Sequence, residues 1–498
     1  MREISSDEIY DRLVGLGLFS EKLPPVFSTE SFLDYCKTKK PMNFRVGWYP
    51  YAVYESMRNV NTPRIIGIPN PIGYERLCRC IADNWEKLCV HFEEKTALDS
   101  HKISRIHVRK MAKTSALFEM NYKNWRTDGT PEPDLLIGAR YVVSADISKC
   151  FPSIYSHAIA WALAGKETAK TSAQKTNTWW NEIDKNTRNL KNGETHGLLI
   201  GPHASNILSE VILCTIDSKL GKKWKYVRNI DDYTCFVSDK IHAESFLLEL
   251  NRELKEFGLY LNHKKTNISE LPMGSVDGWV RKIRDRLAYT DIKSRYLNYL
   301  QIQSFLDFCV SLVVSTGENA SILLYGIKAI KFYRMSMSAR NYMKKTLLSL
   351  ALIYPYLVPI LNDFLFSPEK SDGGGIEFIE SSINLIYENY FRKDHYEAVA
   401  YAIFYAIKAN VKIRGFNIEK ILEENDCVLL TVALLYCRKN NLVKETKKLK
   451  VRALELKKNQ QLGEFWLFVY ECLNANLLVG EWKPMKKNSV SFIKKEYL

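Results

Sequence analysis

The chain has 498 residues, 46% of them hydrophobic, so it can bury a large core and is expected to form two or three domains. Its formal net charge of +15 favours a polyanionic partner or substrate; a merely basic soluble protein is the alternative. The eleven cysteines are scattered and include no Cys-x-x-Cys pair, which argues against a disulfide framework or a zinc site. They are expected to be reduced, buried thiols.

Two features bear on localisation. Residues 1–8 are polar and acidic, so we expect no secretory signal. The longest apolar run, 347–361, is shorter than the ~20 residues that span a bilayer, and it contains Pro355 and Pro359. This run is predicted to be a buried helix, and the protein is predicted to be cytoplasmic, with no membrane partner.

The first predicted elements are a strand and a helix. Residues 64–68 are rich in β-branched side chains and give way to Pro and Asn, which predicts a strand that ends in a turn. After it, apolar residues recur at spacings of three or four, which predicts a helix. These residues are Leu77, Ile81, Trp85 and Leu88.

The middle of the chain alternates short strands and helices. Residues 141–145 predict a strand, and a helix is expected to start near Pro152. Residues 165–195 are polar and rich in lysine, which predicts a loop with little packing. The apolar spacing in 207–216 predicts an amphipathic helix. Another helix is expected over 246–257.

The second half has a different pattern. Gly258 is placed to end the preceding helix in the left-handed conformation. From about residue 290 the apolar spacing is almost entirely helical, which indicates an α-solenoid or an irregular helical array. We therefore predict a mixed α/β domain over 1–285 and an all-α domain over 286–498. The basic run 444–458 is typical of a solvated amphipathic helix; a DNA-guiding surface is the alternative.

An aspartate pair is the strongest chemical signal. Asp231 and Asp232 lie between two short β-prone runs, which predicts a hairpin with the pair at its turn. Asp146 ends the β-prone run at 141–145. A strand-end aspartate beside such a pair can hold two Mg²⁺ ions for nucleotidyl transfer. The alternative is a surface turn, where aspartate is common for conformational reasons.

Four further positions could contact a nucleotide. Phe151, five residues after Asp146, could lie beneath the sugar and exclude a 2′-hydroxyl, or could belong to the core. Gly201 stands in a turn before a helix, where backbone can approach a base or sugar closely. Lys265 could neutralise or protonate departing pyrophosphate, or be an ordinary loop charge. Arg64 could grip a triphosphate through its planar fork, or be a surface arginine.

The order of these motifs resembles that of the reverse transcriptases. An arginine strand, an aspartate with phenylalanine at plus five, a glycine turn before a helix, an Asp-Asp hairpin and Asn-x-x-Lys-Thr follow one another over roughly residues 45–275. The chain most closely resembles the bacterial abortive-infection reverse transcriptases, the Abi polymerases. The segments that carry this likeness are 16–19 with 28–32, 68–71, 151–157 and 195–197.

The resemblance implies a fold, a cofactor and residue roles. The fold is α+β, with reverse transcriptase fingers and palm followed by a HEAT-like helical domain and no evident thumb. Two Mg²⁺ ions, or Mn²⁺, are expected on Asp146, Asp231, Asp232 and the carbonyl of Ile147. The implied substrate-binding residues are Arg64, Ile147, Phe151 and Gly201, with Lys265 as a catalytic acid.

The resemblance also implies partners and a biological role. Abi polymerases make DNA from deoxynucleoside triphosphates without a template, primed by a tyrosine of the protein itself, in bacterial anti-phage defence. A single-stranded DNA product attached to a tyrosine and a homo-oligomer, with a trimer favoured, are therefore expected. The sequence does not select the primer among its 28 tyrosines; Tyr10 and Tyr35, near the N-terminus, are guesses. Ile200 stands where a glutamine is usual and Asn229 where an aromatic residue is usual, which weakens the case for templated copying.

Two other functions stay open. The first is a templated, RNA-directed DNA polymerase of retron or group II intron kind. The second is a polymerase-derived scaffold whose work is done by the helical half, although the presence of Asp146, Asp231 and Asp232 argues against loss of catalysis.

Overall fold

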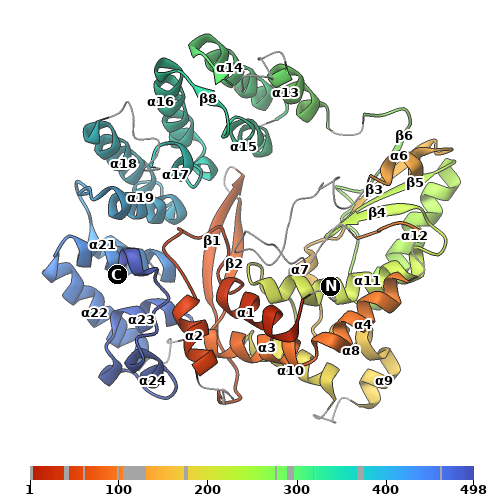
Figure 1. Ribbon diagram of the computed structural model, residues 1–498, viewed down its shortest axis with the longest axis horizontal. Coiled ribbons are helices and arrows are strands. Elements are labelled where there is room, and N and C mark those ends of the chain that lie inside the picture. Colours follow the sequence, from red (N-terminus) through yellow and green to blue (C-terminus); the bar gives the residue numbers. More distant parts are fainter. Residues whose placement is uncertain are drawn as a thin grey trace.

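The computed structural model describes residues 4–38, 44–59, 62–97, 100–104, 130–172, 178–274, 277–288, 296–317, 319–366, 375–424, 426–459 and 463–498. The predicted α+β class is confirmed, and the structure is mostly helical (Figure 1). A two-stranded hairpin and a four-stranded sheet lie in the first part of the chain. The last part is helical and contains one short parallel strand pair among the described residues, β7 (Tyr296–Leu297) with β8 (Arg334–Met335).

The chain starts with helices around a β-hairpin. The hairpin is antiparallel, with Ala52 opposite Ile68, and it confirms the predicted strand at 64–68. The predicted helical pattern that follows forms two helices, because Asn84 interrupts it. These elements are α1 (Ser6–Leu16), α2 (Glu30–Thr38), β1 (Ala52–Asn59), β2 (Thr62–Ile68), α3 (Pro71–Asp83) and α4 (Trp85–Thr96).

The four-stranded sheet has the order β4-β5-β3-β6, and every neighbouring pair is antiparallel. Helix α12 packs on β3 and β5, and α11 packs on α12, on α4 and on α8 (His157–Ala164). Gly258 follows α12 with a φ of 75°, which confirms its predicted left-handed conformation. The elements are α6 (Glu132–Leu136), β3 (Tyr141–Asp146), α11 (His203–Leu220), β4 (Tyr226–Asn229), β5 (Asp232–Val237), α12 (Lys240–Glu256) and β6 (Asn267–Glu270).

The predicted loop at 165–195 is wrong over the described residues. It forms α9 (Lys166–Thr171) and α10 (Trp179–Asn189), and α10 packs against α3 and α8 (His157–Ala164). Its buried face is largely polar, so hydrophobic spacing does not reveal it. The hydroxyl of Thr187 donates to the carbonyl of Ile183 at 2.8 Å, and the carboxylate of Asp184 accepts from Nδ1 of His157 at 2.6 Å.

Helices continue from residue 278 to the C-terminus, as predicted. Helices that are close in sequence pack on one another, with α14 on α16, α18 on α19, α19 on α21 and α21 on α23. They are α13 (Gly278–Ala288), α14 (Tyr299–Ser315), α15 (Ala320–Ala329), α16 (Met337–Ile353), α17 (Leu361–Phe364), α18 (Ile376–Phe391), α19 (Tyr396–Ala409), α20 (Ile418–Glu423), α21 (Cys427–Lys439), α22 (Val443–Lys458), α23 (Trp466–Cys472) and α24 (Trp482–Lys487). Within the described ranges, no helix combines the length and apolarity that crossing a bilayer requires.

Two sequence expectations in this region are resolved. The apolar run 347–361 is not one helix: α16 ends at Ile353 and a 3₁₀ turn covers Pro355–Leu357, since proline cannot continue a helix. The basic run at 444–458 lies in α22, where Leu449, Ala453 and Leu456 are buried. It is therefore an amphipathic helix, and the alternative of a DNA-guiding surface stays a prediction.

The cysteines behave as small hydrophobic side chains. All eleven are free, ten of them are buried, and Cys472 is partly exposed. Burial raises the pKa of Cys80 to about 12, so its thiol is protonated near neutral pH. The predicted burial of the thiols is confirmed.

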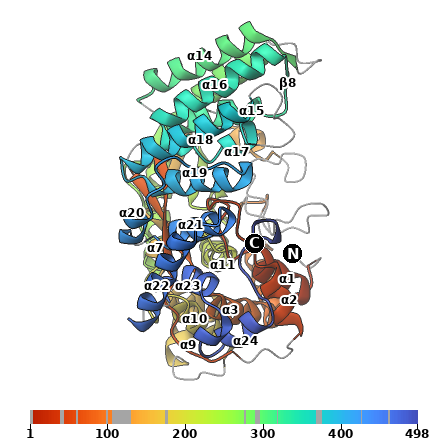
Figure 2. The ribbon, with the colours of Figure 1, turned by 90° about the vertical axis from the view of Figure 1, so that its left-hand side faces the viewer.

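The C-terminal helices return to the N-terminal region (Figure 2). The backbone of Phe27 forms a β-bridge with Ile493, and the amide of Ser28 donates to the carbonyl of Phe492 at 2.9 Å. One hydrophobic cluster runs from Ile4 to Ile493 through both halves. The division into domains at 285/286 stays a prediction, because the two parts share this core.

Candidate active site

Three aspartates converge at one end of the four-stranded sheet. Asp146 is the last residue of β3 and pairs directly with Asp232, the first residue of β5. Asp231 lies in the turn between β4 and β5. Ligand oxygens of the three carboxylates lie within 4.8 Å of one another, and among the described residues this is the one group of three or more His, Cys, Asp or Glu with the geometry of a metal site. The predicted hairpin and the predicted convergence are confirmed.

The carboxylates crowd one another electrostatically. Burial raises the pKa of Asp231 and the charge of Asp146 adds to the rise, while Lys265 and Arg64 oppose it. Burial and the charge of Asp231 raise the pKa of Asp232 to about 6. Close carboxylate oxygens are the ligands that Mg²⁺ and Mn²⁺ prefer, and a cation among them would relieve the repulsion. The donor set therefore fits a divalent ion.

Asp146 is held by the segment that follows α12. Lys265 Nζ lies 2.6 Å from Asp146 Oδ2, and Asn262 Nδ2 donates to Oδ1 at 2.9 Å. The amide of Asn262 also donates to the carbonyl of Asp146 at 2.7 Å. The Lys265 side chain is 52% exposed, so the ion pair is weakly stabilising and the ammonium is free to turn toward a substrate. The structure places Lys265 beside Asp146, and its role as a catalytic acid stays a prediction. Asn262 is an additional contact whose available signal was the Asn-x-x-Lys spacing.

The aspartate turn is supported by Arg228, a residue that sequence reasoning missed. Arg228 is fully buried and donates from Nη1 to the carbonyl of Ile230 at 2.9 Å. Ile230 has a φ of 55°, which is rare for a β-branched residue and must be held by its surroundings. The available signal was a charged side chain within the short strand β4.

Two buried acidic residues, Asp217 and Glu210, hold Arg228 in place. Asp217 Oδ2 accepts from Arg228 Nη2 at 2.6 Å and from Nε at 2.8 Å, and Glu210 Oε1 accepts from Nη2 at 3.1 Å. Ser104 donates to the same Glu210 oxygen at 2.5 Å. Removing one member of such a group leaves buried charge unpaired, so the group fixes the arginine and, through it, the turn.

Ile147 and Phe151 lie in the segment after β3. The amide of Ile147 donates to the carbonyl of Asp231 at 3.1 Å, which joins the two aspartate segments. Phe151 is half-buried in α7 (Cys150–Ser153), and its carbonyl accepts from the amide of Leu198 at 2.8 Å. The structure therefore brings the predicted sugar gate beside the glycine turn, while the carbonyl ligand role of Ile147 stays a prediction.

Gly201 is required by a close backbone approach. Its φ is 125°, and a Cβ atom there would lie 2.9 Å from Cγ2 of Ile66 and 3.3 Å from the carbonyl of Gly67. The carbonyl of Ile200 accepts from the amide of Gly67 at 2.9 Å. The neighbour that fixes the glycine is thus strand β2, and the predicted contact with a base or sugar stays a prediction.

Arg64 lies on β2, in register with Ser56 on β1. It is exposed, and its charge opposes the rise that burial produces in the pKa of Asp231. The guanidinium is therefore within electrostatic reach of the aspartates. Its predicted grip on a triphosphate stays a prediction.

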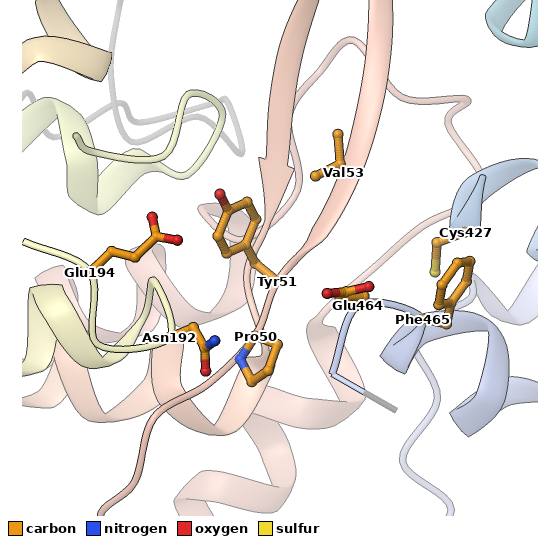
Figure 3. A pocket seen from close by; sticks show the side chains of 8 residues that line it. All are labelled: Pro50, Tyr51, Val53, Asn192, Glu194, Cys427, Glu464 and Phe465. Atoms are coloured by element: carbon orange, nitrogen blue, oxygen red, sulfur yellow. The ribbon is translucent and has the colours of Figure 1, made fainter. Parts of the chain in front are cut away.

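A separate cavity of about 310 Å³ lies at the seam between the start of β1 and the C-terminal helices (Figure 3). Glu194 and Glu464 flank Tyr51 there. None of the three aspartates lines it, so it is distinct from the carboxylate site. Its lining residues are Pro50, Tyr51, Val53, Asn192, Glu194, Cys427, Glu464 and Phe465.

A cluster of carboxylates that fits divalent ions is the donor set of a metal-dependent nucleotidyltransferase. Residues 86–303 match the sequence model of the family described as reverse transcriptase (RNA-dependent DNA polymerase), so the chain contains a reverse transcriptase domain. The match begins and ends later than the expected span of 45–275. The family implies deoxynucleoside triphosphates, nucleic acid and a divalent metal as ligands.

Solved telomerase structures show distant likeness. Truncated apo telomerase from Candida tropicalis is 15% identical over 45% of this chain, with a TM-score of 0.29, and this chain spans about half of it (51%). The longer apo telomerase from Candida tropicalis is 12% identical over 79% of this chain and 76% of its own, with a TM-score of 0.34. Candida albicans telomerase with a TWJ fragment of telomeric RNA is 10% identical over 75% and 69%, with a TM-score of 0.29. No curated protein matches the sequence.

Proposed function

We propose that this protein is a DNA polymerase of reverse transcriptase type that adds deoxynucleotides without a template, primed by one of its own tyrosines. The observation that carries the polymerase part is the convergence of Asp146, Asp231 and Asp232 within 4.8 Å. The untemplated part is supported by Ile200, which replaces a glutamine that helps to position template and substrate in templated relatives. Abortive-infection defence against phage is the corresponding biological role.

The three aspartates are the proposed metal ligands. Asp146, Asp231 and Asp232 would hold two Mg²⁺ ions, with the Ile147 carbonyl as a further oxygen donor. When bound, such ions activate the attacking hydroxyl and stabilise charge on the phosphates. Asn262 orients Asp146, and Arg228 holds the turn that carries Asp231.

Three residues handle the nucleotide. Arg64 grips the triphosphate, Phe151 lies beneath the sugar, and Lys265 gives a proton or a neutralising charge to the departing pyrophosphate. Lys265 starts 2.6 Å from Asp146 and its side chain is half exposed, so it can exchange this carboxylate for a phosphate oxygen.

The primer tyrosine must reach this site with its phenol accessible. Tyr10 is 4% exposed and donates to Glu75 Oε1 at 2.7 Å, and burial raises its pKa far above the ordinary value. Tyr35 is 7% exposed. In this conformation neither phenol is accessible to a nucleotide, which argues against both residues as the primer.

A templated RNA-directed polymerase is the second candidate, favoured by the description of the matched family. Incorporation of a single deoxynucleotide by the purified protein, with Mg²⁺ and no added nucleic acid, supports the first proposal. Dependence on a supplied RNA supports the second. The variant Asp231→Ala should abolish incorporation in either case, and undiminished incorporation would end the metal assignment. A homo-oligomer, with a trimer favoured, is part of the first proposal and is tested by its mass in solution.

A polymerase-derived scaffold is the remaining alternative. It predicts that Asp146→Ala leaves phage resistance intact, whereas a polymerase requires that resistance is lost.

A further inference from the structure

A buried glutamate of the helical half binds the hairpin that carries Arg64. Glu397, on α19, is 4% exposed. Its Oε1 accepts from the hydroxyl of Ser56 at 2.8 Å, and its Oε2 accepts from the amide of Met57 at 2.6 Å. A buried carboxylate is costly unless donors satisfy it, and both of these donors come from β1, some 340 residues earlier in the chain.

The bound position on β1 faces Arg64. Ser56 is the register partner of Arg64 on β2, and paired residues of antiparallel strands lie on the same face. The helical half also contacts other parts of the hairpin. Strand β1 packs on α19 and α21, and Trp466 of α23 donates from Nε1 to the carbonyl of Ile68 at 3.2 Å.

The same hairpin contacts the candidate active site on its other side. The amide of Gly67 donates to the carbonyl of Ile200 at 2.9 Å, and Gly201 packs closely on Ile66. The hairpin therefore lies between the helical half and the glycine turn. A shift of β1 relative to α19 would move Arg64 relative to Asp231.

We propose that Glu397 is a positioning residue: by fixing β1 opposite Arg64, it sets the affinity of the active site for the triphosphate. This inference rests on the proposed role of Arg64 in holding that group. It gives the helical half a function in the reaction although none of the proposed catalytic residues lies in it.

The test compares Glu397→Gln and Ser56→Ala with a matched control, Glu471→Gln. Glu471 is also a buried acceptor of the helical half, 3% exposed, but it accepts from the amide of Phe492 at 2.7 Å and makes no bond to the hairpin among the described residues. The Glu397→Gln and Ser56→Ala variants should raise the KM for a deoxynucleoside triphosphate about 5- to 20-fold, with kcat within about twofold, as loss of a bond to a charged acceptor predicts. Glu471→Gln should leave KM within about twofold.

A double variant separates positioning from general loosening. If Glu397 acts through Arg64, Arg64→Ala with Glu397→Gln should have the KM of Arg64→Ala alone. An unchanged KM in folded Glu397→Gln, an equal rise in Glu471→Gln, or independent multiplication of the two effects would each overturn the inference.

Equilibrium binding of dATP with Ca²⁺ gives a readout that does not need turnover. If the wild type binds dATP but incorporates nothing, the polymerase proposal fails, whereas equal weakening of binding by Glu397→Gln and Arg64→Ala still supports the positioning role. If the wild type incorporates dATP and Glu397→Gln binds it unchanged, only the positioning role fails. A wild type that does not bind dATP would overturn both.

Discussion

Arg228 donates to the carbonyl of Ile230 at 2.9 Å, so a fully buried arginine fixes the residue that precedes the aspartate pair. Ile230 has a φ of 55°, a conformation that a β-branched side chain disfavours. The arginine is itself held by Asp217 and Glu210. The stability of the site and its geometry are therefore linked through one side chain.

Replacing Arg228 should lower the stability of the protein and disturb the geometry of the aspartate turn. Arg228→Met leaves two buried carboxylates unpaired and should lower the free energy of unfolding by about 3–5 kcal/mol, measured by urea denaturation. Arg228→Lys retains the charge but not the planar fork, so it should lie between Arg228→Met and the wild type. Arg252→Met, at a side chain that is 71% exposed, is the control and should change stability by less than about 0.5 kcal/mol. Equal effects at both positions would contradict the supporting role.

Neutralising Asp231 should stabilise the metal-free protein. In Asp231→Asn one charge leaves a crowded group of carboxylates, so the melting temperature without metal should rise by about 1–3 °C. Added Mg²⁺ should raise the melting temperature of the wild type and not that of the variant. The exposed Asp285→Asn is the control and should retain the Mg²⁺ response. A full Mg²⁺ response in Asp231→Asn would exclude Asp231 as a ligand.

Gly201 should tolerate alanine poorly. The new Cβ would lie 2.9 Å from Ile66, at a φ of 125°, so Gly201→Ala should cost about 2–3 kcal/mol of unfolding free energy in urea denaturation. Gly258→Ala is the matched comparison, because its φ is also positive, at 75°, but no atom lies within 4 Å of the added carbon. It should cost about 1 kcal/mol. If the two variants lose the same stability, the close approach to β2 is unimportant.

Phe151 should determine sugar selectivity. Phe151→Ala removes the ring proposed to exclude a 2′-hydroxyl, so the ratio of kcat/KM for deoxyribonucleotides over ribonucleotides should fall by at least tenfold. Phe151→Tyr retains the ring and should preserve most of the selectivity. Unchanged selectivity in Phe151→Ala would assign this half-buried ring to the core instead.

Much of the site was predictable because its signals are local. Asp231 and Asp232 sit between two β-prone runs, and Asp146 ends a third, so strand geometry alone places each carboxylate at a strand end. Their meeting follows from antiparallel pairing of β3 with β5, which puts Asp146 opposite Asp232. The motif order then indicates which strands belong together.

The missed features depend on contacts between distant segments. Arg228 can hold the turn because it is paired with Glu210 and Asp217 on α11. No sequence spacing rule connects these acids with Arg228. Helix α10 buries polar side chains, so hydrophobic periodicity fails there. The contact of Glu397 with Ser56 joins residues 341 apart and depends on how the helical half packs against β1.

The same glutamate should make stability depend on pH. Burial raises the pKa of Glu397 from the ordinary 4.5 to about 7, so the folded protein binds a proton in this interval more readily than the unfolded chain does. The resulting stabilisation is fully present below pH 4.5 and is lost as pH rises through 7, a change of about 3 kcal/mol at most. Glu397→Gln cannot titrate, so its free energy of unfolding should fall less steeply than that of the wild type between pH 5 and 8 in urea denaturation. Asp426, whose pKa burial raises to about 6, titrates in both proteins, and its charge contributes to the raised pKa of Glu397. Parallel curves for the two proteins would mean that the Glu397 carboxyl already titrates near its ordinary pKa and is better solvated than its contacts with β1 indicate.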